Sequence, residues 1–204
     1  YGVNNINRFL QNNNPNTPIQ WGDLTYKVDD PVLFNETQRF GPSIYNNLKG
    51  KILRIEPTDR YIQFDIEIEK VLNETDVMFY NLELLDSEDE YKSIIRFQVN
   101  KFKSTDEDDN SSDDVVPFQV AYAVSIHKAQ GLEYNSVKVV ISNEVEERIT
   151  HSIFYTAITR AKEKLKIYWS PETQKYVLEN MKRRDNRRDV GLLRNFITIS
   201  GSQP

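Results

Sequence analysis

The chain has 204 residues, of which 38% are hydrophobic and 11% aromatic, so it can bury the core of one large or two small domains and is not a disordered chain. Its formal net charge of −5 and pI near 5.2 provide no overall basic field of the kind that indicates nucleic-acid binding, although a local basic groove can still occur on an acidic protein. The lack of cysteine excludes disulfides and Cys-based zinc sites, and the lack of a signal peptide or of a membrane-length apolar run predicts a soluble, cytoplasmic protein.

The opening segment predicts a short helix that runs into a polar loop. Its apolar residues recur at helical spacing, and two prolines follow that end the pattern. These residues are Val3, Ile6, Phe9 and Leu10, followed by Pro15 and Pro18. Because the chain begins at Tyr1 rather than at a methionine, we expect it to be a piece of a longer protein.

From about Tyr26 to Phe102 the sequence alternates apolar and polar residues, with turn signals about every ten residues. This texture predicts a small antiparallel β-barrel or sandwich. The clearest alternating runs are 61–71, 76–85 and 92–102. The block 105–114, "TDEDDNSSDD", has six acidic side chains and no apolar one, and it predicts a solvated, flexible loop.

After Pro117 strands alternate with helices, which indicates a parallel α/β sheet. We expect strands at 120–125, 136–142 and 165–170, and a helix at 151–164. A second helix is predicted to begin at the Ser170–Pro171 N-terminal signal and to end in five basic residues between Lys182 and Arg188. The whole pattern predicts an α/β unit that is interrupted by an inserted β unit.

The stretch "SIHKAQGLEY" at 125–134 concentrates polar groups where the first predicted α/β strand ends. Ligands of open α/β sheets bind at that edge, where Ser125, His127 and Lys128 could donate to phosphate oxygens. Gly131 would permit a sharp turn, and Glu133 could accept from a sugar hydroxyl. A strand-to-helix turn with solvated polar residues is the alternative.

The second stretch, "FYTAITRAKEK" at 154–164, has a single Arg in a mostly small and apolar run. Arg160 is either a surface residue or an arginine finger that contacts a transferring phosphoryl group. The sequence has no GxxxxGK[ST] phosphate loop, and no acidic pair ends an apolar strand to hold magnesium. If the chain handles a nucleotide, it supplies only half of the site.

Together, "AYAVSIHKAQGLEY" and "FYTAITRAKEKL" resemble motifs V and VI of superfamily 1 UvrD/RecD-like DNA helicases, closest to the RecD-like branch that includes the exodeoxyribonuclease V alpha subunit. The segments "GVNNINRFLQ" and "YKVDDPVLFNE…YNNLKGKI" also resemble the region before motif V in that branch. The resemblance touches most of residues 1–170. Its "HKAQG" form favours DNA helicases over the related RNA helicases.

The resemblance implies an α/β fold, a RecA-like helicase domain (2A) without its own phosphate loop, interrupted by an SH3-like barrel (2B). Residues 1–27 and 117–204 would form domain 2A, residues 28–104 the barrel, and residues 105–116 an acidic flexible loop. ATP would bind between domain 2A and an N-terminal RecA-like domain that is missing from this sequence and that is expected to carry the Mg²⁺ ligands. The isolated chain is therefore predicted to be inactive.

The resemblance also implies roles for individual residues. Ser125, His127 and Lys128 correspond to motif V positions near the backbone of single-stranded DNA. The nucleotide-facing positions are Gln130, Gly131 and Glu133. Arg160 corresponds to the motif VI arginine at the γ-phosphate, with no metal ligand in this chain. The parent would be an ATP-dependent helicase or translocase that moves 5′ to 3′, possible partners being the subunits of a nuclease–helicase complex.

Two features depart from the family pattern and leave the loop contacts of the barrel open. The Gly-Asp before the first barrel strand is Asp29–Asp30 here, and the usual turn before the barrel is replaced by "YNNLKGK". The basic stretch 182–188 is either a DNA contact or a solvated helix end. Tyr122, Tyr134 and Tyr155 either stack on bases or pack in the core. A stand-alone nucleic-acid- or protein-binding module without ATPase activity is the competing function.

Overall fold

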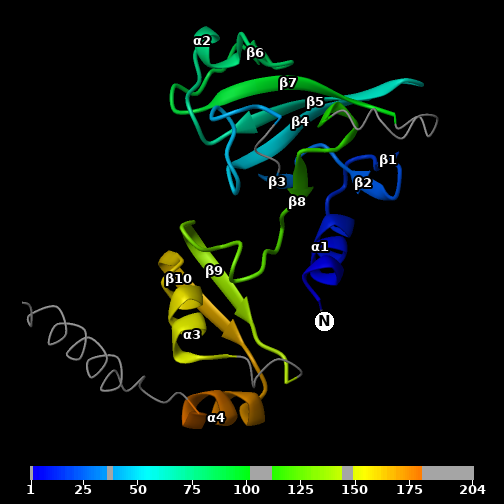
Figure 1. Ribbon diagram of the computed structural model, residues 1–204. Coiled ribbons are helices and arrows are strands. Elements are labelled where there is room, and N and C mark those ends of the chain that lie inside the picture. The colour runs from blue at the N-terminus through cyan, green and yellow to red at the C-terminus, as the bar shows by residue number, and fades with distance from the viewer. Residues whose placement is uncertain (1, 36–38, 102–111, 144–148, 181–204) are drawn as a thin grey trace, which may run out of the picture. The chain divides into compact units, whose positions relative to one another are not determined.

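In the computed structural model, residues 2–35, 39–101, 112–143 and 149–180 are described. The chain divides into two compact units between Ala129 and Gln130. The first unit contains a six-stranded antiparallel sheet and the second a two-stranded parallel one (Figure 1). The protein is therefore a mixed α/β chain, as the sequence predicted.

The first unit begins with helix α1 (Val3–Asn12), which confirms the predicted opening helix. None of its side chains is fully buried, and Phe9 is 69% exposed. At the C-terminal end of the helix, the ammonium of Lys27 binds two main-chain carbonyl groups. Its Nζ donates to Gln11 O (3.1 Å) and to Asn14 O (2.7 Å). A positive charge at this end also opposes the partial negative charge of the helix dipole.

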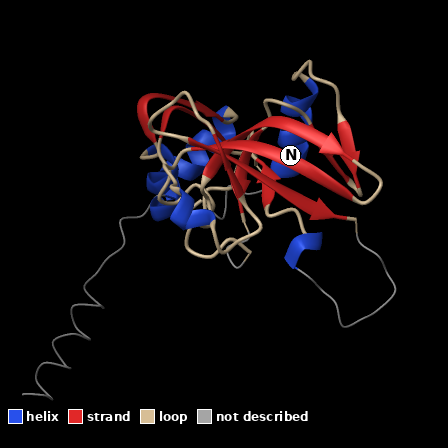
Figure 2. Cartoon of the chain, turned by 90° about the horizontal axis from the view of Figure 1, so that it is seen from above, coloured by secondary structure: helices blue, strands red, loops and turns tan. Residues whose placement is uncertain are grey.

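The sheet of the first unit has the strand order β6-β7-β5-β4-β3-β8, and all neighbours are antiparallel. This confirms the antiparallel β-structure that the alternating pattern predicted after Tyr26. The strands are drawn in red in Figure 2. Their bounds are β3 Pro31–Phe34, β4 Lys49–Pro57, β5 Tyr61–Ile68, β6 Glu83–Leu85, β7 Ser93–Asn100 and β8 Phe118–Val120. A hairpin of β1 (Ile19–Trp21) and β2 (Leu24–Tyr26) precedes them.

The core of this unit is built on interlocking aromatic rings. Phe64 has no exposed surface, and its ring meets Phe118 and Tyr26 edge-on at centroid distances of 5.0 and 5.3 Å. Phe97 packs against Phe40 at 5.2 Å. Edge-to-face rings add to the stabilisation from area burial alone, so this cluster contributes strongly to the stability of the sheet.

A buried arginine lies beside the same core. Arg39 is 8% exposed, and its guanidinium stacks over the rings of Phe40 and Phe97. It donates to the carbonyl groups of Val115 and Gln98, and its Nε lies 3.2 Å from Asp113. Burial lowers the pKa of Arg39, and the facing carboxylate opposes that shift.

The end of the predicted acidic loop is structured where the structure describes it. Ser112–Asp114 form a 3₁₀ turn, and Asp113 is the carboxylate that pairs with Arg39. Residues 105–111 lie outside the described residues, as does the basic stretch 182–188.

The strand predicted over 76–85 is wrong for most of its length. A short helix, α2 (Glu74–Val77), begins there, and only β6 at the end of the run is extended. Asn73 accepts from the amides of Thr75 and Asp76, while the Asp76 carboxylate accepts from the Asn73 amide. This capping box satisfies the first free N–H groups of a helix, and it outweighs the strand-like alternation.

The strand predicted over 120–125 is also shifted. Its described counterpart is β8, which ends at Val120 and pairs with β3. Residue Ala123 instead bonds through both its N–H and its C=O to the side chain of Asn7. Because these peptide groups already have partners, the segment does not join a sheet.

The second unit is a β–α–β unit followed by a helix. Strand β9 (Tyr134–Val140) pairs in parallel with β10 (Ala161–Tyr168), and helix α3 (His151–Ile158) lies between them in the chain. Helix α4 (Pro171–Asn180) follows. The predicted strand, helix, strand and helix are thus confirmed in order and type.

In this unit, N-terminal side-chain caps explain where the two helices begin, and strand pairing explains why α3 ends earlier than predicted. The hydroxyl groups of Thr150 and Ser170 accept from the amides of Ile153 and Thr173. The helix predicted over 151–164 ends at Ile158 instead, because Ala161 already pairs with Tyr134 of β9. The assignment of residues 1–27 and 117–204 to one RecA-like domain stays a prediction.

Candidate functional site

The first predicted motif begins with a tight turn over Ser125–Ala129 in the first unit. The Ser125 carbonyl accepts from the Ala129 amide at 3.0 Å, and its hydroxyl accepts from the Lys128 amide at 3.4 Å. Ser125 therefore acts as a local cap of the turn. His127 and Lys128 are exposed, and the Lys128 ammonium donates to the Gln119 side chain. The turn thus presents an imidazole and a cation to solvent.

The rest of that motif lies in the second unit. Gly131 has φ +84°, and no heavy atom lies within 4 Å of the place where a Cβ would stand. The left-handed backbone, not lack of space, therefore favours glycine at this turn. Gln130 and Glu133 are exposed, and the Glu133 carboxylate lies 3.2 Å from the ammonium of Lys162.

Arg160 connects the end of α3 to this glycine turn. Its Nε donates to the Thr156 carbonyl at 2.9 Å, and one terminal nitrogen donates to the Thr159 hydroxyl at 3.1 Å. The other donates to the Leu132 carbonyl at 3.1 Å, and the Tyr134 amide donates to the Arg160 carbonyl at 2.9 Å. A guanidinium at a helix C-terminus satisfies free carbonyls and complements the helix dipole.

The structure therefore brings together some of the predicted site residues. Arg160 hydrogen-bonds to Leu132, which stands between Gly131 and Glu133 in the chain, so these residues from the two motifs are neighbours within the second unit. Ser125, His127 and Lys128 share the turn of the first unit. Arg160 does not project from the middle of a helix, because α3 ends two residues before it.

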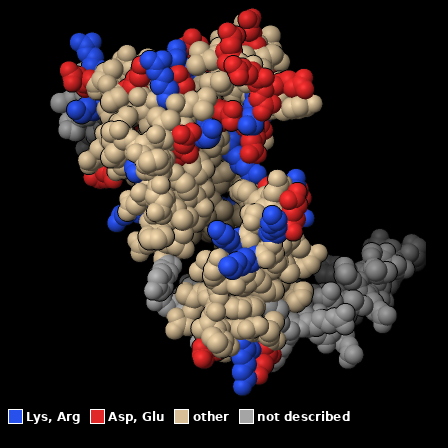
Figure 3. Space-filling model, turned by 180° about the vertical axis from the view of Figure 1, so that it is seen from behind, with Lys and Arg blue, Asp and Glu red and all other residues tan. Residues whose placement is uncertain are grey.

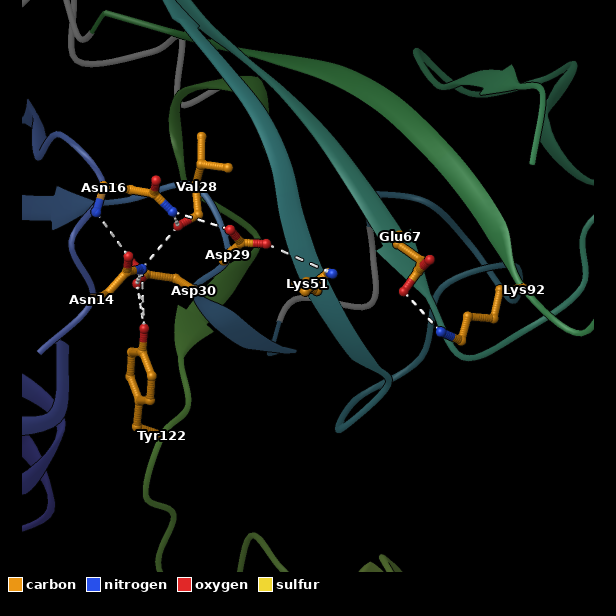
Figure 4. A network of polar contacts seen from close by, with 9 residues as sticks. All are labelled: Asn14, Asn16, Val28, Asp29, Asp30, Lys51, Glu67, Lys92 and Tyr122. Atoms are coloured by element: carbon orange, nitrogen blue, oxygen red, sulfur yellow. Dashed lines mark hydrogen bonds and ion pairs between the residues drawn. The ribbon is translucent and has the colours of Figure 1, made fainter. Parts of the chain in front are cut away.

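A network that the sequence did not predict surrounds Asp30, which has no exposed surface. Its carboxylate accepts from the Tyr122 hydroxyl at 2.8 Å and from the Asn14 side chain at 3.0 Å (Figure 4). The only sequence signal was the run of asparagines between α1 and Pro15. The hydroxyl group of Tyr122 therefore has polar partners within this unit.

Burial, and after it the hydrogen bond to Asp30, raise the pKa of Tyr122 from 10.0 to about 12. The phenol of the unfolded chain then ionises first, so stability that is complete below about pH 10 is lost as the pH rises towards 12. We expect the difference in the free energy of unfolding between the wild type and Tyr122→Phe to shrink over that range. Urea denaturation at several alkaline pH values measures it.

Tyr91→Phe is the matched control for this prediction, because Tyr91 is 74% exposed. Other titrating groups are common to both proteins and cancel in the difference. A Tyr122→Phe difference that stays constant from about pH 9 to about pH 12 would show that the Tyr122 phenol is not protected by folding.

Among the described residues, no group of three or more His, Asp or Glu side chains is placed to hold a metal ion. Within the same residues, no helix combines the length and the apolar character that crossing a membrane requires.

The comparisons with known proteins point to one family. The model of the UvrD-like helicase C-terminal domain matches residues 120–168, which run from the last residue of β8 to the last residue of β10. This stretch contains both the Ser125–Ala129 turn and Arg160.

The curated relatives are much longer than this chain. An uncharacterized protein of Methanocaldococcus jannaschii, MJ1519, is 34% identical over 108 residues, which are 52% of this chain and 8% of that protein. The RecBCD enzyme subunit RecD of Buchnera aphidicola is 33% identical over 64 residues, 31% of this chain and 11% of its own length. RecD of Mycolicibacterium smegmatis is 37% identical over 49 residues, 24% of this chain and 9% of its own length. Through residues 120–168 the chain is therefore similar to the C-terminal part of UvrD/RecD-like helicases.

Proposed function

We propose that this chain is the C-terminal half of an ATP-dependent RecD-like DNA helicase or translocase. It would supply motif V and an arginine finger to an ATP site that an N-terminal RecA-like domain outside this sequence completes. The observation that carries the proposal is the contact between Arg160 and the Leu132 carbonyl, which joins the two motifs in one unit.

The geometry of Arg160 suits a finger. A guanidinium has five N–H donors. Three of them bond to Thr156, Thr159 and Leu132, so among the described residues each terminal nitrogen keeps one N–H without such a partner. Two parallel N–H groups on neighbouring nitrogens match two phosphate oxygens. The three bonds would hold the fork in place before the nucleotide arrives, so little reorganisation would be needed during the reaction.

The nucleotide-facing roles follow from the same turn. Glu133 would accept a hydrogen bond from a ribose hydroxyl and give up its exposed ion pair with Lys162. Losing this pair would cost little free energy, because exposed ion pairs contribute little to stability. Gly131 would allow the backbone beside Gln130 to approach the nucleotide closely. We assign the Mg²⁺ ligands to the N-terminal domain, since the described residues contain no cluster of three or more acidic or histidine side chains that could hold a metal ion.

The exposed strands of the second unit support the idea that this unit is part of a larger sheet. Parallel sheets normally have both faces covered. Here five consecutive residues of β10, 162–166, are exposed, and Leu165 is 44% exposed. Val140 of β9 is 55% exposed. We therefore assign this unit to a RecA-like domain whose inserted barrel, SH3-like in our assignment, comprises strands β3 to β7 of the first unit.

For DNA we assign the Ser125–Ala129 turn. Lys128 would exchange its bond to Gln119 for a phosphate oxygen, and the exposed His127 would donate to another. Acidic side chains instead gather over the end of the first unit that carries α2 and β6 (Figure 3). Residues 69–90 contain a single basic residue and eight acidic ones: Glu69, Glu74, Asp76, Glu83, Asp86, Glu88, Asp89 and Glu90. That end would repel a phosphate backbone.

ATP hydrolysis would drive movement along single-stranded DNA, because the two RecA-like domains would bind the strand alternately. ATP would draw the two RecA-like domains together through Arg160, and loss of the γ-phosphate would release them, so that the strand advances. We assign a 5′-to-3′ direction from the RecD-like branch. Subunits of a nuclease–helicase complex are the proposed protein partners.

The first test is steady-state ATP hydrolysis by the full-length protein with and without single-stranded DNA. We expect turnover that DNA stimulates, and no turnover by residues 1–204 alone. A second assay compares strand displacement on duplexes with a 5′ or a 3′ single-stranded tail, and the 5′ tail is the expected substrate. A full-length protein that binds DNA but hydrolyses no ATP would replace this proposal with the stand-alone binding module.

A further inference from the structure

The segment between β8 and the Ser125–Ala129 turn is held by side chains. Asn7 of α1 pairs with both peptide groups of Ala123: its Nδ2 donates to the carbonyl at 2.8 Å, and its Oδ1 accepts from the amide at 2.7 Å. One amide side chain thus takes the place of a neighbouring strand. The main chain at Ala123 is fixed by a residue more than a hundred positions away in sequence.

A second contact holds the residue before it. The Tyr122 hydroxyl donates to Asp30 Oδ1 at 2.8 Å and lies 3.2 Å from Asn14 Nδ2, which donates to it and to Asp30. The other carboxylate oxygen of Asp30 accepts from the Lys27 amide at 2.8 Å and from the Gln11 side chain. A fully buried carboxylate is tolerated because several donors satisfy it.

The same network attaches α1 to the turn that precedes the sheet. The Asn14 side chain also donates to the Val28 carbonyl, and Asn16 donates to Asp29 at 3.0 Å (Figure 4). Asp29 has φ +68°, which lies in the left-handed region. Since α1 buries no residue completely, these polar contacts fix its place in the first unit.

Only Val124 separates the fixed residue Ala123 from Ser125, which caps the turn that carries His127 and Lys128. The direction of the chain at Ala123 therefore determines where this turn begins. We propose that Asn7 and Asp30 are positioning residues: acting through the main chain at Ala123 and through Tyr122, they hold the Ser125–Ala129 turn in the orientation that contacts the DNA backbone. This inference rests on the proposed DNA contact of that turn.

Loss of the Asn7 side chain should therefore affect DNA binding and ATP turnover differently. Without the Asn7 clamp, the residues before Ser125 regain backbone freedom that DNA binding must then remove. Affinity for DNA should fall, whereas ATP turnover with saturating DNA should not, because Asn7 bonds to Ala123 within the first unit and the proposed nucleotide residues Gln130, Gly131 and Glu133 belong to the second.

The first experiment measures amide hydrogen exchange in the 204-residue chain for Asn7→Ala. Its control is Asn5→Ala, since Asn5 is an exposed asparagine of the same helix and the gain in helix propensity is similar. Relative to the control, we expect exchange to be faster by about tenfold at Ala123 and also at Ala129, whose amide bonds to Ser125. The amides of β5 and β7 should keep their rates, which shows that the sheet remains folded.

The second experiment measures the DNA concentration that half-saturates ATP hydrolysis by the full-length protein. We expect about a three- to tenfold increase for Asn7→Ala with unchanged maximal turnover. Asn7→Asp keeps an oxygen that accepts from the Ala123 amide but turns a second oxygen towards the Ala123 carbonyl, so its increase should be at least as large. Tyr122→Phe keeps the ring and removes the hydroxyl that Asp30 accepts from, and it should shift the concentration in the same direction.

The outcomes separate this inference from the proposed function. Faster exchange at Ala123 without any change at Ala129 would overturn the positioning role, even if DNA stimulates the ATPase. An unchanged half-saturating DNA concentration in Asn7→Ala would do the same. A parent without ATPase activity would overturn the proposed motor, while the exchange rates would still decide whether Asn7 holds the turn.

Discussion

Replacing Arg160 by alanine in the full-length protein should lower DNA-stimulated ATP turnover by on the order of 10³-fold or more. A finger acts where negative charge is spread over the transferring phosphoryl group, so its loss affects turnover more than ATP binding. Steady-state hydrolysis over a range of ATP concentrations separates kcat from KM. Arg160→Lys should recover only a small part of the activity, because an ammonium cannot present two parallel N–H groups.

A structural role for Arg160 has to be separated from this catalytic one. Its bonds to Thr156 and Leu132 also hold the end of α3 against the glycine turn, so the alanine variant loses contacts within the second unit. Hydrogen exchange of β9 and β10 in the variant shows whether the unit stays folded. Lys164→Ala removes an exposed cation from the same unit and should leave turnover within about twofold of the parent. Near-normal turnover in a folded Arg160→Ala protein would overturn the finger assignment.

Phe64→Ala should be strongly destabilising for the first unit, by about 3–5 kcal/mol of the free energy of unfolding. Phe64 has no exposed surface and contacts Tyr26, Phe97 and Phe118 through its ring. Alanine would leave a cavity among rings that also pack against each other and cannot collapse easily. A loss of this size is a large fraction of the stability of an ordinary domain.

Urea denaturation followed by tryptophan fluorescence measures the loss. Trp21 packs against the core of the first unit, so a Trp169→Phe background makes the signal report that unit. Phe79→Ala is the control: the chemical change is identical, but Phe79 is 80% exposed, and we expect a change within about 0.5 kcal/mol. Similar losses in the two variants would mean that the aromatic cluster does not stabilise the unit.

Local sequence patterns predicted elements wherever one local interaction dominates. The alternation in 61–68 and 93–100 became β5 and β7, because one face of each strand packs in the core. The Ser170–Pro171 signal started α4 through the hydroxyl cap on Thr173. The resemblance to UvrD-like helicases was also evident from the sequence, because it rests on contiguous runs of residues within 120–168. The roles of the individual site residues stay predictions.

The remaining features depend on partners that are distant in sequence. No local pattern shows that Asn7 bonds to Ala123, 116 positions away, or that this bond keeps residues 121–124 out of a sheet. Nor does a local pattern show that Asp30 is fully buried, because the donors that satisfy it come from α1 and from Tyr122. The sequence alone determined the elements that have strong local signals, such as β5, β7 and α4, and which family the chain resembles, since those depend on near neighbours. Only the tertiary structure decided which backbone and carboxylate groups are satisfied by which side chains, because hydrogen bonding of buried polar groups depends on the whole fold.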